Sequence, residues 1–119
     1  MKIFILEDDA TRQQWLRERL IDHDITIIES CRDAAKFVGP YDLILLDHDL
    51  GGRQLEAHED CGLLFVQRCK DRFGDAEVIA HTYNSAGANA MRAQHRMYVA
   101  PFRGREFCDL LDHIEKTCG

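Results

Sequence analysis

Two short apolar segments in the first half of the chain each run directly into acidic residues. Glu7 and Asp8 follow the first segment, and Asp47 and Asp49 follow the second. If both segments are neighbouring strands of a parallel sheet, the four carboxylates meet beyond the carboxyl ends of the strands. Carboxylates this close repel one another unless a cation or a shared proton relieves the charge. Oxygen ligands favour Mg²⁺ or Mn²⁺, so we expect a divalent-metal site.

Two histidines occupy comparable positions. His48 follows Asp47 directly, and His81 follows a later apolar run, a few residues before Asn84. Imidazole titrates near neutral pH, so either histidine is a candidate general acid or base. Either is also a candidate metal ligand, which would shift the preferred ion towards Mn²⁺ or Zn²⁺. Asn84 offers an amide donor for a non-bridging phosphate oxygen.

Further residues suit the recognition of a phosphate. Arg12 can donate charged hydrogen bonds to a non-bridging oxygen, and Gly51-Gly52 would let the backbone approach a ligand closely. The polar stretch from residue 50 to residue 60 exceeds the roughly 2–6 residues of an ordinary strand-to-helix connection. We therefore expect a lid or recognition surface there, with His58 as the next histidine able to reach the pocket.

Each of these residues also has an ordinary structural interpretation. Asp8 or Asp9 could cap the helix that follows them, and Asn84 could cap a later one. His48 could simply hold the loop after its strand. Arg12 could be a solvated residue on an exposed helix face. The sequence leaves both interpretations open for each residue.

The elements that must position these side chains alternate along the chain. Short, mostly β-branched or bulky apolar runs without strict alternation predict strands buried on both faces; they lie at residues 3–6, 25–28, 43–46, 78–80 and 97–100. Helical periodicity fills residues 11–21, 62–72 and the C-terminal segment, and Ser30 with Asp33 resembles a helix start. Strand and helix alternation predicts a three-layer α/β sandwich with a five-stranded parallel sheet in the flavodoxin-like order 2-1-3-4-5.

Composition narrows the class of partner. The 119 residues are the size of one domain, which we place at 1–119, and the net charge is −6. An acidic chain argues against a nucleic-acid duplex or an anionic membrane as the main partner, but it leaves room for a small phosphorylated ligand. We find no signal peptide and no apolar segment long enough to span a membrane, and five scattered cysteines favour reduced thiols, so we expect a cytoplasmic protein.

Taken together, these residues resemble the receiver domain of two-component response regulators across essentially the whole chain. Glu7-Asp8 looks like its acidic metal-binding pair and Asp47 like its phosphoacceptor aspartate. Thr82 would be the hydroxyl residue after the fourth strand, unless His81 occupies that position. Pro101-Phe102 looks like the pair that follows the receiver lysine, but Ala100 stands where that lysine belongs.

A divergent branch of the receiver family gives the fuller resemblance. The matching motifs are Glu7-Asp8-Asp9 with Arg12, Asp47-His48-Asp49-Leu50-Gly51-Gly52, His81-Thr82-Tyr83-Asn84 and Met91-Arg92. That branch is proposed to process cyclic phosphates. The resemblance implies hydrolysis of a cyclic or nucleotide-linked phosphate, with catalytic roles for Asp47, His48, His81 and Asn84. It implies phosphate-binding roles for Arg12, Gly51, Gly52, Thr82 and Arg92, and metal-binding roles for Glu7, Asp8, Asp47 and Asp49.

Three functions remain open from the sequence. The first is a metal-dependent phosphoesterase acting on a cyclic or nucleotide phosphate, with a cyclic nucleotide as one such ligand. The second is a degenerate receiver that is phosphorylated on Asp47, or not at all, and acts by binding a protein partner or a second copy of itself. The third is a sensor that binds a phosphorylated ligand without turning it over. The missing lysine at Ala100 and the added histidines favour the first.

Overall fold

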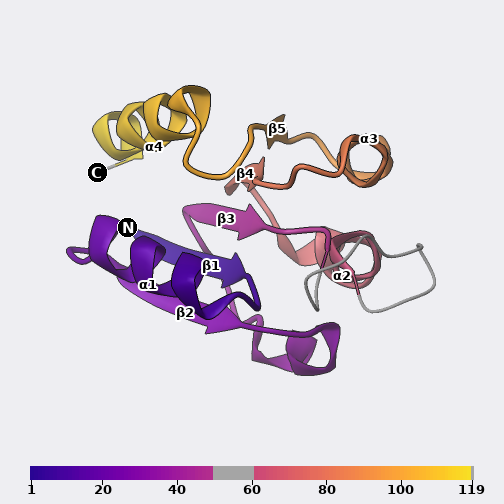
Figure 1. Ribbon diagram of the computed structural model, residues 1–119. Coiled ribbons are helices and arrows are strands. Elements are labelled where there is room, and N and C mark those ends of the chain that lie inside the picture. Colours follow the sequence, from indigo (N-terminus) through magenta and orange to yellow (C-terminus); the bar gives the residue numbers. More distant parts are fainter. Residues whose placement is uncertain (50–60, 119) are drawn as a thin grey trace.

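The strands form the predicted sheet. The computed structural model describes residues 1–49 and 61–118. The strands are β1 (Lys2–Leu6), β2 (Asp24–Ile28), β3 (Leu43–Leu46), β4 (Glu77–Ala80) and β5 (Tyr98–Val99). They pair in parallel in the order β2-β1-β3-β4-β5, which confirms the expected α/β fold (Figure 1).

Helices cover both faces of the sheet. They are α1 (Ala10–Arg19), α2 (Gly62–Cys69), α3 (Ser85–Gln94) and α4 (Arg105–Cys118), with short 3₁₀ helices η1 (Cys31–Lys36) and η2 (Lys70–Arg72). Leu16 of α1 and Phe107 of α4 share one apolar cluster with Ile5 of β1. Phe65 of α2 packs with Leu6 in the cluster on the opposite face (Figure 1). Successive residues of β1 therefore point to different helix layers, as the period of a strand requires.

Two elements differ from the sequence expectation. The helix expected after Ser30 is the short 3₁₀ helix η1, in which the Ser30 hydroxyl accepts from the Arg32 N–H at 3.1 Å. Few residues separate β2 from the buried Phe37, and 3₁₀ helices are used in such short pieces. Strand β5 is limited to Tyr98–Val99, because Pro101 soon follows and has no N–H for further pairing.

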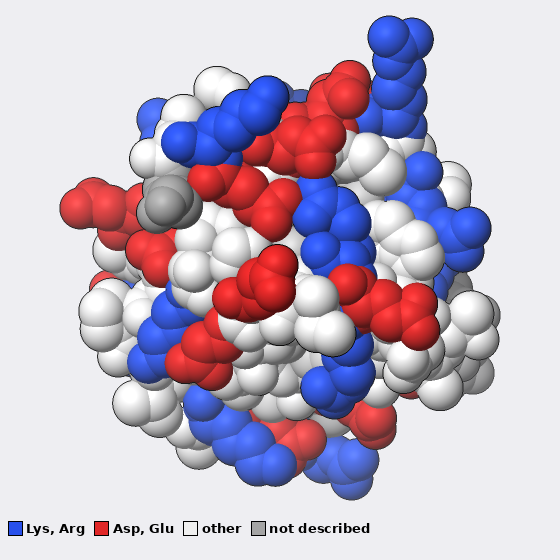
Figure 2. Space-filling view, turned by 90° about the vertical axis from the view of Figure 1, so that its left-hand side faces the viewer, with Lys and Arg blue, Asp and Glu red and all other residues white. Residues whose placement is uncertain are grey.

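The two ends of the strands lie on opposite sides of the molecule. The arrowheads in Figure 1 show that the carboxyl ends of β1, β2 and β3 lie together on the right of the view. The opposite side, which faces the viewer in Figure 2, carries basic and acidic side chains in close mixture. We see no large area of a single charge on that face, so its charges offer no obvious site for a highly charged ligand.

Within residues 1–49 and 61–118, every helix falls short of the length and apolar character that crossing a bilayer would require.

Candidate functional site

Four residues continue the sheet by one position beyond the strands. Their backbone N–H groups donate to the carbonyl of a neighbouring strand end: Glu7 to Ile28 (3.0 Å), Asp47 to Leu6 (3.0 Å), His81 to Leu46 (2.8 Å) and Ala100 to Ala80 (3.1 Å). Residues level with one another in a parallel sheet point to the same face. This row therefore points to the layer of α1 and α4, and it places His81, rather than Thr82, level with Asp47.

Three of the four predicted metal ligands converge at this row. One carboxylate oxygen from each of Glu7, Asp8 and Asp47 lies within 4.8 Å of the other two. Glu7 and Asp47 are 0 % and 4 % exposed, so water does little to separate their charges. A set of oxygen donors this close suits a hard divalent cation such as Mg²⁺ or Mn²⁺. The structure does not bring Asp49 into this group.

Glu7 is held as a buried carboxylate. His81 Nε2 lies 3.0 Å from Glu7 Oε1, and the Asp9 N–H donates to Oε2 at 3.0 Å. Burial by itself raises the pKa of Glu7, but the hydrogen bond and charge of His81, the Asp9 N–H and the Arg12 charge outweigh it. The pKa of Glu7 therefore lies below its usual value, and its negative charge persists at neutral pH.

Asp47 is the carboxylate of the group whose ionised form is least stabilised. Burial raises its pKa to about 6, and the charge of Glu7 adds to the rise, although His81 and Arg12 oppose it. The Asp49 N–H is its backbone donor, at 3.4 Å from Oδ1. At neutral pH Asp47 is thus ionised at a cost in free energy, which a bound cation would relieve.

Arg12 brings a positive charge to the row from α1. Its Nη1 lies 3.6 Å from Glu7 Oε1 and 3.9 Å from Asp47 Oδ2. Its guanidinium lies over the rings of Phe102 and Tyr83, at 5.0 and 5.7 Å from their centroids. Ala100 contributes only a methyl group to the row. The positively charged side chain beside the carboxylates therefore comes from helix α1 and not from the segment after β5.

Helix capping was the alternative role for Asp8, Asp9 and Asn84, and the structure shows it at Asp9 and Asn84. Asp9 caps α1, because its Oδ1 accepts from the Arg12 N–H at 2.9 Å. Asp8 belongs to the three-carboxylate group instead. Asn84 caps α3, because its Oδ1 accepts from the Gly87 N–H at 3.0 Å. The cap leaves the Asn84 amide group available for other contacts.

His48, Asp49 and Asn84 form a second polar cluster, which we call the His48 cluster. Asn84 Nδ2 donates to Asp49 Oδ1 at 2.9 Å, and His48 Nδ1 lies 3.0 Å from the same oxygen. His48 follows Asp47 by one residue, so its side chain points to the opposite layer, towards α2 and α3. Thr82 also serves this region, where its hydroxyl accepts from the Asn84 N–H at 3.1 Å. The two histidines therefore serve different clusters.

Two glycines that the sequence analysis did not single out make this packing possible. A Cβ at Gly87 would lie 2.5 Å from His48 Cγ, and a Cβ at Gly62 would lie 2.5 Å from the Asp47 carbonyl oxygen. Both distances are too short for any side chain. A glycine inside a helical pattern is the available sequence signal, since it often marks close packing. Tyr83 and Phe102, which support Arg12, were likewise not assigned to the site.

The remaining predicted residues lie apart from these clusters or outside the description. Arg92 is exposed on α3 and takes part in none of the contacts above. Gly51, Gly52 and His58 lie outside the described residues, so their predicted roles stay predictions.

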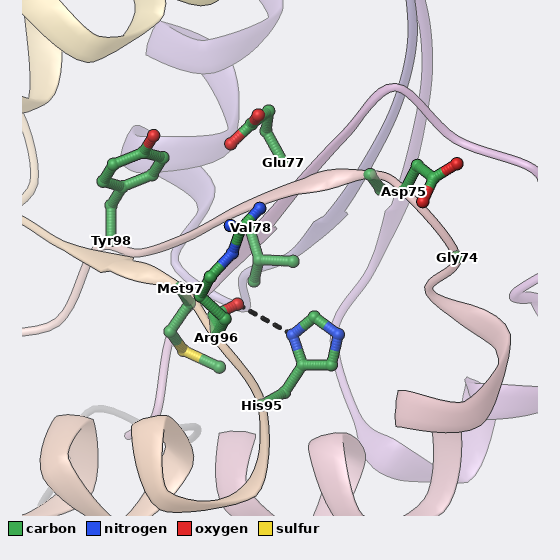
Figure 3. Close-up of a pocket in the computed structure, with 9 residues that line it drawn as sticks. Gly74, Asp75, Glu77, Val78, His95, Arg96, Met97 and Tyr98 are labelled. Carbon is green, nitrogen blue, oxygen red and sulfur yellow. Dashed lines mark hydrogen bonds between the residues drawn. The ribbon is translucent and has the colours of Figure 1, made fainter.

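A hollow of about 570 Å³ opens beside the row. Its lining comes from the start of α1 and from the segments after β4 and β5: Asp9, Thr11, Arg12, Tyr83, Phe102, Arg103 and Gly104. We call it the Arg12 hollow. A second hollow of about 530 Å³ lies between the amino ends of β4 and β5, and Figure 3 shows its labelled residues Glu77, Tyr98 and Arg96. Only the first adjoins the carboxylates.

Several solved structures with this fold are response regulators. The chain is 25% identical to TrrA of Thermotoga maritima in complex with Mg²⁺-BeF, with a TM-score of 0.69 over 96% of this chain and 99% of that one. The Mn²⁺-bound form of the response regulator Rcp1 is 20% identical, with a TM-score of 0.61 over 96% and 88%. TrrA in complex with the histidine kinase ThkA is 25% identical, with a TM-score of 0.66 over 96% and 98%.

The family comparison is more specific. Among curated proteins, none matches the chain significantly. The sequence profile described as the cyclic-phosphate processing receiver domain matches residues 1–96, which include every residue of the three-carboxylate group and of the His48 cluster. Most of the chain is matched, and the sheet order and acidic row agree with the match. The chain therefore belongs to the cyclic-phosphate processing receiver domain family.

Proposed function

We propose that this chain hydrolyses a cyclic or nucleotide-linked phosphate with a divalent cation held by Glu7, Asp8 and Asp47. The observation that carries the proposal is the convergence of these carboxylates within 4.8 Å, with Asp47 ionised at a cost. Arg12 Nη1 lies 3.9 Å from Asp47 Oδ2, which is too far for a hydrogen bond, so the arginine does not saturate the Asp47 carboxylate.

The bound cation would supply Lewis-acid polarisation of a phosphoryl oxygen and would neutralise the carboxylates. The chain's own residues supply the remaining interactions. Arg12 faces the same space and can donate to a non-bridging oxygen, where it would stabilise charge that develops during phosphoryl transfer. His81 holds Glu7 through Nε2 and is the better candidate of the two histidines to hold or move a proton near the carboxylates. His48 instead orders Asp49 and Asn84.

The test is metal-dependent turnover of a panel of cyclic mono- and dinucleotides, followed by ³¹P NMR. We expect the wild-type protein to open at least one phosphodiester with Mg²⁺ or Mn²⁺, and Asp47→Asn to lower the rate by about 100-fold or more. Asp112→Asn, the same change in an exposed ion pair of α4, serves as the matched control. If the wild-type protein turns over no member of the panel with Mg²⁺, Mn²⁺ or Zn²⁺, the proposal is wrong.

A phosphorylated receiver is the second candidate function. It is favoured by the position of Asp47 beside two acidic residues in a fold shared with TrrA, which is solved with Mg²⁺-BeF and with a histidine kinase. On this hypothesis a kinase-like partner or a small phosphodonor phosphorylates Asp47. Beryllofluoride binding that Asp47→Asn abolishes, in a protein that turns over no cyclic phosphate, would favour this candidate over hydrolysis.

A further inference from the structure

We infer that the Arg12 hollow binds the planar ring of a nucleobase, so that the phosphate handled at the carboxylates belongs to a nucleotide. This inference rests on the proposed function for the phosphate end of the ligand and adds the chemical class of the rest. The hollow shares Arg12 with the carboxylate row, because Arg12 lines the hollow and its Nη1 lies 3.6 Å from Glu7 Oε1. Its volume of about 570 Å³ lies within the range of small-molecule sites.

Tyr83 gives the hollow an exposed aromatic wall that is fixed in place. Tyr83 is 65% exposed, which is more than any other aromatic residue that the structure describes. The Tyr83 hydroxyl donates to the Phe102 carbonyl at 3.1 Å, which anchors the far end of the ring. A rigid aromatic surface costs little entropy when a second ring stacks on it. Base stacking on such side chains is a general mode of nucleotide binding and tolerates any base.

Arg12 links the ring surface to the phosphate region. Its guanidinium lies over the rings of Tyr83 and Phe102, and its Nη1 also lies near the carboxylates of Glu7 and Asp47. Its separations from both carboxylates exceed hydrogen-bond length, so N–H groups remain for a ligand oxygen. A ligand with a phosphate at one end and a flat ring at the other matches this order of groups.

Arg103 also lines the hollow. Its backbone has a φ of 61°, an unfavourable conformation for a residue with a side chain. Such backbone strain is found preferentially at ligand sites. The Arg103 guanidinium lies 5.8 Å from the ring of Trp15, which makes a second flat, cationic surface beside the hollow. Both walls therefore suit a planar, electron-rich ring.

The hollow at the amino ends of β4 and β5 lacks this combination. It has a similar volume and an aromatic residue, Tyr98, which is 45% exposed. Its Asp75 and Glu77 side chains lie along the same opening as Arg96 (Figure 3). It lies at the opposite end of β4 from His81 and the carboxylates. Tyr98 is therefore a matched control for an exposed tyrosine that has no phosphate site beside it.

The experiment compares adenosine 5′-monophosphate with ribose 5-phosphate, two phosphomonoesters that differ at the anomeric carbon, which carries adenine in the first and a hydroxyl group in the second. Calorimetry with Mg²⁺ gives both affinities, and the fluorescence of the single tryptophan, Trp15, reports events near Phe102, 5.4 Å away. We expect adenosine 5′-monophosphate to bind about 10-fold tighter or more. Neither probe contains a cyclic phosphodiester, so the result does not depend on whether the protein hydrolyses one.

Variants of Tyr83 and Tyr98 test whether the tighter binding of adenosine 5′-monophosphate comes from the Arg12 hollow. Tyr83→Leu should reduce the ratio of affinities to about 2-fold or less, whereas Tyr83→Phe, which keeps the ring, and Tyr98→Leu should preserve most of it. Circular dichroism checks that each variant is folded. Equal affinities for the two probes in the wild-type protein would overturn the inference, as would failure of both to bind. Loss of both affinities in parallel in Tyr83→Leu would also overturn it, because Tyr83 would then only support Arg12.

Discussion

The same four types of side chain meet at two places in this molecule, with different results. The buried cluster contains Glu7, Asp47, His81 and Arg12, and the surface cluster contains Glu115, Asp112, His23 and Arg19. In the surface cluster, His23 Nε2 lies 2.7 Å from Glu115 and Arg19 Nη2 lies 2.8 Å from it, with Asp112 in direct contact with Arg19. In the buried cluster the arginine stays at 3.6 and 3.9 Å from the two carboxylates.

Burial explains the difference between the two clusters. The Asp112 side chain is 60% exposed, so water and Arg19 together satisfy it. Burial tends to raise the pKa of Glu115, but its contacts with Arg19 and His23 prevail, and its pKa falls below the usual value. Asp47 is buried and Arg12 approaches it only to 3.9 Å, so burial prevails and raises the pKa of Asp47 to about 6. The surface cluster joins α1 to α4, whereas the buried cluster leaves the charge of Asp47 only partly compensated.

The largest difference in stability between the two clusters is expected when the histidine of each, His81 or His23, is replaced. His81→Leu leaves the buried Glu7 carboxylate without its nearest partner, so we expect the free energy of unfolding to fall by about 3 kcal/mol or more. His23→Leu removes a partly exposed contact and should cost within about 1 kcal/mol. Urea denaturation of both variants at pH 7 measures the difference. Equal losses would show that burial does not distinguish the clusters.

Asp47→Asn and Asp112→Asn each remove one negative charge, and they should change the free energy of unfolding in opposite directions. The folded-state pKa of Asp47 is raised, so its ionisation opposes folding, with a cost that is complete above about pH 6 and absent below the unfolded value of 3.8. A shift of this size corresponds to about 3 kcal/mol. In metal-free protein, Asp47→Asn should therefore stabilise the fold by up to about 3 kcal/mol at pH 8, and the gain should disappear near pH 3.5.

The control for this experiment is Asp112→Asn, which should lower stability by less than about 1 kcal/mol at pH 8. Unfolding midpoints measured from pH 3.5 to pH 8 give both profiles. An Asp47→Asn variant that is less stable than the wild-type protein at pH 8 without metal would contradict the raised pKa.

Metal affinity should distinguish the two glutamates. Glu7→Gln removes one of three converging carboxylates and should weaken Mn²⁺ binding by about 100-fold. Glu115→Gln carries the same change in the surface cluster and should leave Mn²⁺ affinity unchanged. Calorimetric titration of the two variants provides the comparison. Mn²⁺ binding that is insensitive to Glu7→Gln would place the cation elsewhere in the protein.

The smallest expected effect is that of salt on the surface cluster. Arg19→Gln should destabilise the fold by about 0.2–1 kcal/mol in 50 mM NaCl, and most of this loss should vanish in 1 M NaCl, because exposed ion pairs are screened. The loss caused by His81→Leu should persist in 1 M NaCl, because the Glu7–His81 pair is fully buried. Parallel denaturation curves at the two salt concentrations test this contrast.

The sequence by itself predicted the sheet and the acidic edge. Buried parallel strands are nearly continuous apolar runs, so the first polar residue after each run marks the end where ligands bind. That reasoning found Glu7, Asp8, Asp47 and His81. It also left a choice between His48 and His81 near the carboxylates, and it placed Asp49 among the metal ligands.

Only the tertiary structure decided how these side chains divide between the two faces of the sheet. A one-residue difference in position turns a side chain to the other helix layer, so Asp47 and His48 belong to different clusters although they are adjacent in sequence. The positive charge beside Asp47 comes from Arg12, and the docking of α1 on Phe102 and Tyr83 places it there. Contacts between residues so far apart in the chain arise from packing, which local sequence patterns do not encode.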